Sequence, residues 1–257
     1  MIKKILKHLL IALIWLCIWQ GLAMAVGEEL LFPTPITVVA RIFELLSTAV
    51  FYKTVGYSLL RILLGMIAGT VIGALGGLLT SFSRIAKDFF APLLAIVKST
   101  PVASFIILLV LYVSRDLTPL IIAVMMVVPV VWTNVETGLK NTDKALLEMA
   151  EAYKMRSISK IRHIYIPSVS PYFFAALRSS LGMAWKAGIA AEVLLQPLIS
   201  IGKQIFEAKH TLETTDLFAW TSIVVVLSVI IEKVTVFILK KILKNHSFDV
   251  KGGVALG

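Results

Sequence analysis

The chain has 257 residues, of which 58% are hydrophobic and only 16% are charged, whereas soluble domains contain about 45–50% apolar and about 25% charged residues. Because the apolar residues are gathered into long runs, the composition excludes an ordinary soluble domain and indicates a protein of the lipid bilayer. The net charge of +10 does not indicate a nucleic-acid partner, since the basic residues mostly flank apolar segments. The single cysteine, Cys17, excludes an intramolecular disulfide framework.

Six apolar segments are long enough to cross roughly 30 Å of hydrocarbon. We expect them to be helices, because within lipid each backbone polar group must find its hydrogen bond inside the protein. The six predicted spans are residues 9–26, 55–80, 89–113, 117–139, 171–194 and 217–239. The sequence therefore predicts an all-α, polytopic membrane protein, with one transmembrane domain over residues 1–257.

The first apolar segment has a second interpretation, a cleaved secretory signal. Two nearby lysines and the small residues 23–25 (Ala-Met-Ala) resemble such a signal and its cleavage site. Trp15, Trp19 and an apolar run of about eighteen residues are more typical of a retained membrane helix. We expect retention; cleavage would leave five spans in the same orientation.

Lysine and arginine are distributed unevenly across the predicted loops. With the N-terminus inside, the inner segments carry fifteen of these residues, the last of them Lys251. The outer loops carry only Arg41, Lys53, Arg115, Lys203 and Lys209. The excess of positive charge predicts that both termini are cytoplasmic.

The second apolar segment contains glycines at four-residue spacing. This spacing places them on one face of a helix, so that another helix can approach the backbone closely. The four residues are Gly65, Gly69, Gly73 and Gly77. We interpret this face, which Gly76 widens, as a packing seam without chemistry.

The largest predicted inner loop, residues 140–170, carries the pattern of two short helices. Asp143 can cap the first, because its carboxylate accepts hydrogen bonds from free amides at a helix start. Ser157 can cap the second, and Pro167 and Pro171 are expected to interrupt the path to the fifth span. The first helix has an apolar stripe at helical spacing, made of Ala145, Leu146, Met149, Ala152 and Tyr153.

Three interpretations of this loop compete: helices in the lipid interface, a solvated connector, and helices docked in a groove of another protein. An interfacial helix would need a broader apolar face with bulky anchors. The stripe is partly alanine, which is better suited to a protein groove. The residue pattern alone leaves the choice open.

A family resemblance bears on this choice. Residues 147–153 (LEMAEAY), followed by 164–167 (IYIP), resemble the Glu-Ala-Ala loop of binding-protein-dependent ABC importer permeases. More narrowly, they resemble the nitrate, sulfonate, taurine and bicarbonate branch. Stretches that agree occur in order along nearly the whole chain, including 31–35 (LFPTP), 58–61 (SLLR), 184–185 (AW) and 190–192 (AAE).

The resemblance implies that the loop is a coupling helix seated in a cleft of a separate ATPase subunit. The matching positions imply a docking element made of Glu148, Ala150, Glu151, Ala152, Tyr153 and Met155. The family usually has glycine where this chain has Lys154. Because a residue with a Cβ adopts a left-handed turn only at a cost, we expect the turn to differ or to move to Met155-Arg156.

The resemblance also implies an assembly and a solute. It implies a homodimer in a bacterial cell membrane, with two ATPase subunits below and an extracytoplasmic solute-binding protein above. The implied solute is a small anion such as nitrate, a sulfonate, taurine or bicarbonate, and the alternative is a pyrimidine-like vitamin precursor.

Several chemistries have no motif in the chain. It lacks a Gly-x-x-x-x-Gly-Lys-Ser/Thr phosphate loop and a Gly-x-Ser-x-Gly elbow, and its four histidines are scattered. We therefore predict no catalytic residue, metal or cofactor, and nucleotide chemistry outside this chain. Two other classes stay open: a membrane-embedded enzyme, and an ATP-independent carrier or channel, which would not need a docking loop.

Lys186 is the most unusual residue inside a predicted span. It lies about fifteen residues into the fifth segment, where a lysine costs a few kcal/mol unless it finds water, a partner or the interface. It either snorkels outward or pairs with Glu192, or it lines the translocation path and attracts an anion. The resemblance does not supply a role for it.

Overall fold

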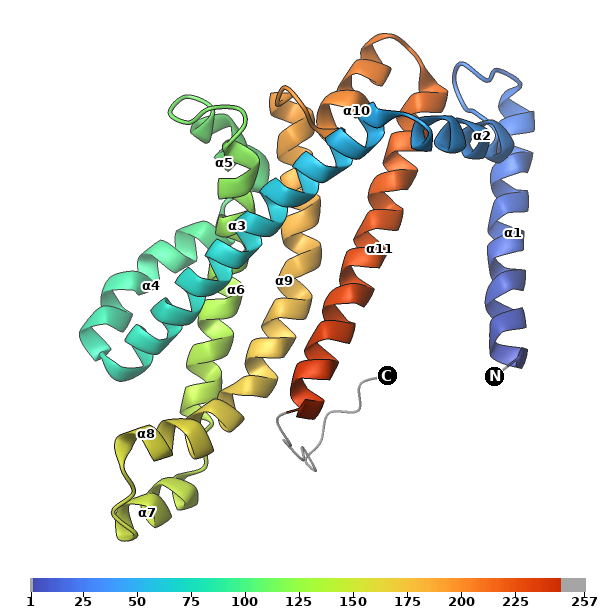
Figure 1. Cartoon of the computed structure of the whole chain (residues 1–257). Helices are drawn as coiled ribbons and strands as arrows, with labels where there is room; N and C mark the ends of the chain where they lie inside the picture. The colour runs from blue at the N-terminus through green and yellow to red at the C-terminus, as the bar shows by residue number, and fades with distance from the viewer. Residues whose placement is uncertain (1, 246–257) are drawn as a thin grey trace. The chain divides into compact units, whose positions relative to one another are not determined.

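The structure is a computed structural model that describes residues 2–245, and every regular element in this range is helical (Figure 1). Lys251 and the outermost residues of both termini lie outside this range. In chain order the helices are α1 (Ile2–Val26), α2 (Pro35–Leu46), α3 (Ala49–Phe82), α4 (Arg84–Ser99), α5 (Val102–Leu109), α6 (Thr118–Lys140), α7 (Lys144–Ala152), α8 (Ser157–Lys160), the π-helix η1 (Ile161–Tyr165), α9 (Ile166–Leu195), α10 (Ile201–His210) and α11 (Thr214–Asn245). The predicted all-α class is confirmed.

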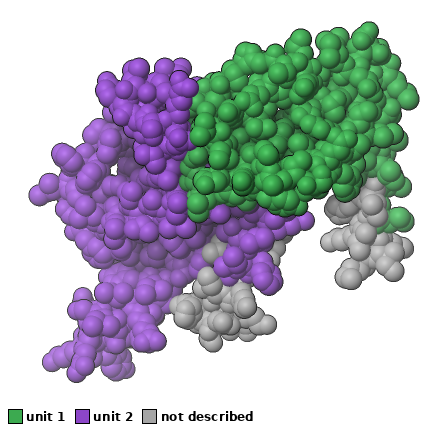
Figure 2. All heavy atoms as spheres, turned by 45° about the horizontal axis from the view of Figure 1, so that its top comes forward, with its two compact units in different colours: residues 1–61, 189–227 green, residues 62–188, 228–257 purple. Residues whose placement is uncertain are grey.

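The chain divides into two compact units, shown in green and purple in Figure 2. The first unit combines residues 1–61 with 189–227, and the second combines 62–188 with 228–257. The division falls inside α3, α9 and α11. Each unit is therefore assembled from segments that are distant in sequence.

Three described helices are long and apolar enough to cross a membrane: Ala49–Phe82, Thr118–Lys140 and Thr214–Ile238. They match the second, fourth and sixth predicted spans. The apolar part of α1, Leu10–Val26, is shorter. Helix α9 is long enough, but its polar residues keep it outside this apolar set. The six-span topology therefore stays a prediction.

The third predicted span is interrupted. Helices α4 and α5 meet at an angle of 102°, and together they would count as one broken span or a re-entrant loop. The break falls at Thr100 and Pro101. Proline disfavours the helical conformation of the residue before it, and Thr100 is extended, with φ −81° and ψ 130°. This local restriction turns the chain where hydropathy alone predicts a continuous run.

Helices α3 and α6 pack backbone to backbone in the second unit. A Cβ atom placed on Gly65 would lie 2.4 Å from the carbonyl oxygen of Leu120, and one on Gly73 would lie 2.8 Å from that of Val128. The glycine face of α3 thus lies against α6. Beside it, a Cβ on Gly76 would lie 2.2 Å from the indole ring of Trp132. Small residues allow this close approach, which places that ring between the helices.

The first unit has a charged link between α2 and the start of α11. The Arg41 guanidinium donates to both carboxylate oxygens of Asp216, at 2.5 and 2.9 Å, and to Glu44 at 2.8 Å. Hydrogen bonds to these two acids raise the pKa of Arg41 above its ordinary value. A bidentate guanidinium–carboxylate pair fixes orientation as well as distance. It therefore orients α2 on α11.

Candidate functional site

The short helix α7 begins as the sequence predicts. The carboxylate of Asp143 accepts a hydrogen bond of 2.9 Å from the backbone N–H of Ala145. This bond satisfies one of the free donors at the helix start, so the predicted N-cap is confirmed. In Figure 1, α7 and α8 protrude beyond the neighbouring ends of α6 and α9.

The apolar stripe of α7 is uncovered by the described chain. Leu146, Met149 and Tyr153 are 41%, 46% and 79% exposed. The rest of the implied docking element is also exposed, apart from two members: Ala150 is fully buried, and Met155 is half-buried. The stripe is thus free for a partner, whereas Ala150 packs inside the loop.

The turn after α7 lies at Lys154, which has a φ of 52°. The N–H of Lys154 donates to Glu151 and that of Met155 donates to Ala150, both at 2.9 Å. These bonds satisfy carbonyls at the end of α7 and hold the left-handed conformation, which costs about 1–2 kcal/mol for a residue with a Cβ. The expectation that the turn would move to Met155-Arg156 is wrong.

Two other expectations about this loop are also wrong. Ser157 is the first residue of α8 and makes no capping bond, since Arg156 occupies the N-cap position. Pro167 and Pro171 do not interrupt the path, because η1 leads directly into α9 and α9 continues through both. Pro167 has no N–H to donate into the preceding turn, and the residues before it have the wider π-helical hydrogen bonding, in which the N–H of Ile166 donates to Ile161. Near the second proline, the Ser170 hydroxyl donates to a backbone carbonyl, at 2.6 Å.

A fully buried carboxylate, Glu192, belongs to the first unit. One oxygen accepts 2.7 Å from the Ser58 hydroxyl and 3.3 Å from the N–H of Gly202, and the other accepts 2.7 Å from Arg61. Ser58 in turn accepts from the N–H of Ile201 at 2.9 Å. We call these five residues the Glu192 cluster. It joins α3, α9 and the start of α10.

Sequence patterns alone do not predict the Glu192 cluster. The sequence suggests Glu192 as a candidate partner of Lys186, and Ser58, Arg61 and Glu192 all lie in stretches that carry the family resemblance, but nothing in these patterns brings the three together. The structure leaves Lys186 exposed, and within the described range no carboxylate pairs with it. The pairing of Lys186 with Glu192 is therefore wrong.

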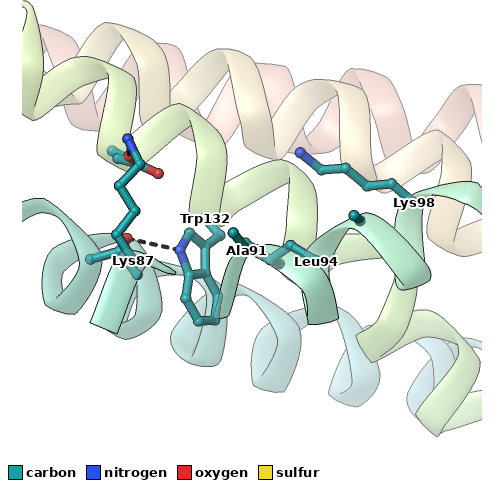
Figure 3. A pocket seen from close by; sticks show the side chains of 8 residues that line it. Lys87, Ala91, Leu94, Lys98 and Trp132 are labelled. Carbon is teal, nitrogen blue, oxygen red and sulfur yellow. Dashed lines mark hydrogen bonds and ion pairs between the residues drawn. The ribbon is translucent and has the colours of Figure 1, made fainter. Parts of the chain in front are cut away.

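A second set of charged side chains lines a cavity of about 280 Å³ in the second unit (Figure 3). We call it the α4 cavity. Its floor is formed by buried Thr80 and Trp132, whose indole N–H donates to the Thr80 hydroxyl at 3.0 Å. The cavity is lined by Thr80, Lys87, Ala91, Leu94, Ala95, Lys98, Trp132 and Glu136.

The α4 cavity has more positive than negative charge. The Glu136 carboxylate lies 3.1 Å from the amino group of Lys87 and 2.5 Å from that of Lys140. Lys98 also lines the cavity, and no carboxylate among the described residues pairs with it. No motif in the sequence brings Lys87 and Lys98 together. Their spacing on one face of α4, eleven residues apart, was the available signal.

Comparison with known proteins identifies the class. The apolar spans define a multi-pass membrane protein. The model of the binding-protein-dependent transport system inner membrane component family matches residues 61–246, so the chain belongs to this family of ABC importer permeases. Within the described residues, no group of three or more His, Cys, Asp or Glu side chains is arranged to hold a metal ion.

Its curated relatives are transport permeases. The putative aliphatic sulfonates transport permease protein SsuC of Bacillus subtilis is 26% identical, with 95% of this chain and 89% of the relative aligned. The nitrate import permease protein NrtB of Synechococcus elongatus is 26% identical over 75% of this chain and 73% of the relative. The formylaminopyrimidine transport permease protein ThiX of Halalkalibacterium halodurans is 25% identical over 70% and 72%.

A solved structure shares the fold. A chain from a crystal structure of an amino acid ABC transporter with histidines superposes with a TM-score of 0.61 and 14% identity. The match covers 80% of this chain and 96% of that chain. At this identity the likeness shows the fold of an ABC transporter permease.

Proposed function

We propose that this chain forms the translocation path of an ATP-driven importer, as a homodimer with two ATPase subunits and an extracytoplasmic binding protein. It would cross a bacterial cell membrane six times, with α1 retained, both termini in the cytoplasm and α7–α8 on the cytoplasmic side. The observation that carries the proposal is the uncovered apolar stripe on α7, beside the family's coupling motif.

The character of the stripe supports docking to a protein. Leu146, Met149 and Tyr153 present apolar surface that gains free energy when it is removed from water, at about 25 cal/mol per Å². Exposed Ala152 leaves room for a partner to approach closely between the larger side chains. Exposed Glu148 and Glu151 on the same short helix would orient it by charge.

The solute proposed for the importer is a small anion. Relatives named for sulfonate and nitrate transport support this class, and the charge surplus of the α4 cavity agrees with it. The relative named for formylaminopyrimidine favours the alternative, a pyrimidine-like vitamin precursor. We also propose that Lys186, which is exposed, lines the translocation path.

Ala152→Trp tests the coupling assignment. We expect this protein to fold and insert but to lose its ATPase partner in copurification and to lose ATP-driven uptake into proteoliposomes. A groove fitted to alanine admits an indole only with strain of about 1–3 kcal/mol. Lys144→Trp, on an exposed residue of α7 outside the docking element, is the matched control.

Normal copurification and uptake by the Ala152→Trp protein would show that α7 does not dock.

The same uptake assay tests Lys186, the proposed residue of the translocation path. If the solute is an anion, the Lys186→Glu protein should transport it more slowly than the wild type; an unchanged rate removes Lys186 from the path.

A further inference from the structure

We propose that the α4 cavity is a binding site for a small free oxyanion, with Lys98 as its main ligand. The inference rests on the proposed function, because it gives the importer's anion a place to bind within this chain. Its evidence is the charge, the geometry and the walls of the cavity.

The charges differ between the two ends of the cavity. Glu136 is held by Lys87 and Lys140, so these three residues already interact among themselves. Lys98 is the remaining cation of the lining; it is exposed and has no carboxylate partner among the described residues. An amino group that has no protein counter-ion and faces a partly enclosed space attracts an anion more strongly than one in open water.

The geometry of α4 brings this amino group over the cavity. Helical side chains lean toward the N-terminus of their helix, so Lys98 leans back over Leu94 and Ala91. Figure 3 shows its side chain running in the direction of Lys87. The ammonium group is thus directed over the cavity floor rather than away from it.

The walls limit the size and shape of the ligand. A volume of about 280 Å³ is at the small end of the range for small-molecule sites. Apolar Ala91, Leu94, Ala95 and the Trp132 ring can contact a short carbon chain. Thr80 already bonds Trp132 and the carbonyl oxygen of Gly76, which fixes the ring as a wall. The site therefore suits a nitrate, a bicarbonate or a short alkyl sulfonate.

Calorimetric titration of the purified protein in nanodiscs of neutral phosphatidylcholine tests the site. The probes are ethanesulfonate and ethyl methyl sulfone, which has nearly the same shape without the charge. We expect the wild type to bind only the sulfonate and Lys98→Met to bind it about tenfold more weakly, the usual effect of losing one hydrogen bond to a charged group.

Two variants separate the site from general charge and from folding. Arg84→Met removes one positive charge from an exposed residue of α4 that does not line the cavity, and should leave binding unchanged. Lys98→Arg should retain most of the affinity. Equal binding by the wild type and Lys98→Met, or equal loss in Lys98→Met and Arg84→Met, overturns the proposal.

Lipid and uptake arms distinguish the other outcomes. If ethanesulfonate binding no longer depends on Lys98 in phosphatidylglycerol nanodiscs, a lipid headgroup occupies the site and the proposal is overturned. If the complex with its ATPase transports no sulfonate, nitrate or bicarbonate but Lys98-dependent binding persists, the proposed function fails and the site stands. If uptake is normal in Lys98→Met and its binding is unchanged, the site fails and the function stands.

Discussion

The Glu192 cluster and the α4 cavity each place a carboxylate beside a cation, and they differ in how completely the groups are used. Each oxygen of buried Glu192 has its donor, from Ser58 and Gly202 on one side and Arg61 on the other. Glu136 also has its partners, but Lys98 lines the same cavity and pairs with no carboxylate in the part of the chain that the structure describes. The carboxylate of the Glu192 cluster is buried and is paired with a guanidinium. The α4 cavity is open, and its lining has surplus positive charge.

This difference separates a structural role from a binding role. A buried charge is tolerated when it is paired and hydrogen-bonded, so the Glu192 cluster holds three helices together, and both oxygens of its carboxylate already accept hydrogen bonds from the protein. An open cavity with surplus charge can exchange its counter-ion with the solution. The Glu192 cluster is therefore suited to holding helices together, and the α4 cavity is suited to binding an anion.

The largest effect is expected from Glu192→Leu. It would leave the partly buried Arg61 without its carboxylate and Ser58 and Gly202 without their acceptor, and lower the free energy of unfolding by about 3–5 kcal/mol. Thermal unfolding in detergent measures this. Glu232→Leu, which removes an exposed acid 3.6 Å from Arg178, is the control and should cost about 1 kcal/mol or less. If Glu192→Leu and Glu232→Leu lowered the stability equally, the Glu192 cluster would not have the structural role that distinguishes it from the α4 cavity.

A smaller effect is expected from Gly76→Ala. The new Cβ would lie 2.2 Å from the Trp132 ring, so the ring must leave the floor of the α4 cavity and its bond to Thr80. We expect a loss of about 1–3 kcal/mol of stability and weaker ethanesulfonate binding, with no change of charge. Calorimetry and tryptophan fluorescence report both. Gly182→Ala is the control, because a Cβ there meets nothing within 4 Å. If Gly76→Ala left the ethanesulfonate affinity unchanged, the Trp132 ring would not be part of the anion site.

The smallest effect is expected from Glu136→Gln. Removing this charge leaves Lys87 and Lys140 without their acid and increases the positive charge of the cavity. Ethanesulfonate affinity should therefore rise about two- to fivefold at low salt, and the gain should shrink as ionic strength increases. Glu207→Gln, at an exposed acid of α10 paired with Lys203, serves as the control. Weaker binding in Glu136→Gln would instead show that Glu136 holds Lys87 in place as a ligand.

Local patterns in the sequence predicted several features correctly. Asp143 caps α7, since an N-cap depends only on residues within one turn. Long apolar runs correspond to α3, α6 and α11, since hydropathy needs only chain length and composition. The turn at Lys154 does not follow from residue propensity, because two backbone hydrogen bonds hold the left-handed conformation there.

The sequence by itself determined the helical class, the apolar spans and the family, because these depend on periodicity and on motifs within short stretches. Only the tertiary structure decided which groups meet. Ser58 and Arg61 reach Glu192 across 134 and 131 residues, and Trp132 reaches Thr80 across 52. The place of Lys98 at the α4 cavity likewise depends on the break between α4 and α5 at Pro101 and on the packing of α4 beside α6. A charge becomes structural or available only when its neighbours in space have taken up its hydrogen bonds, and those neighbours are distant along the chain.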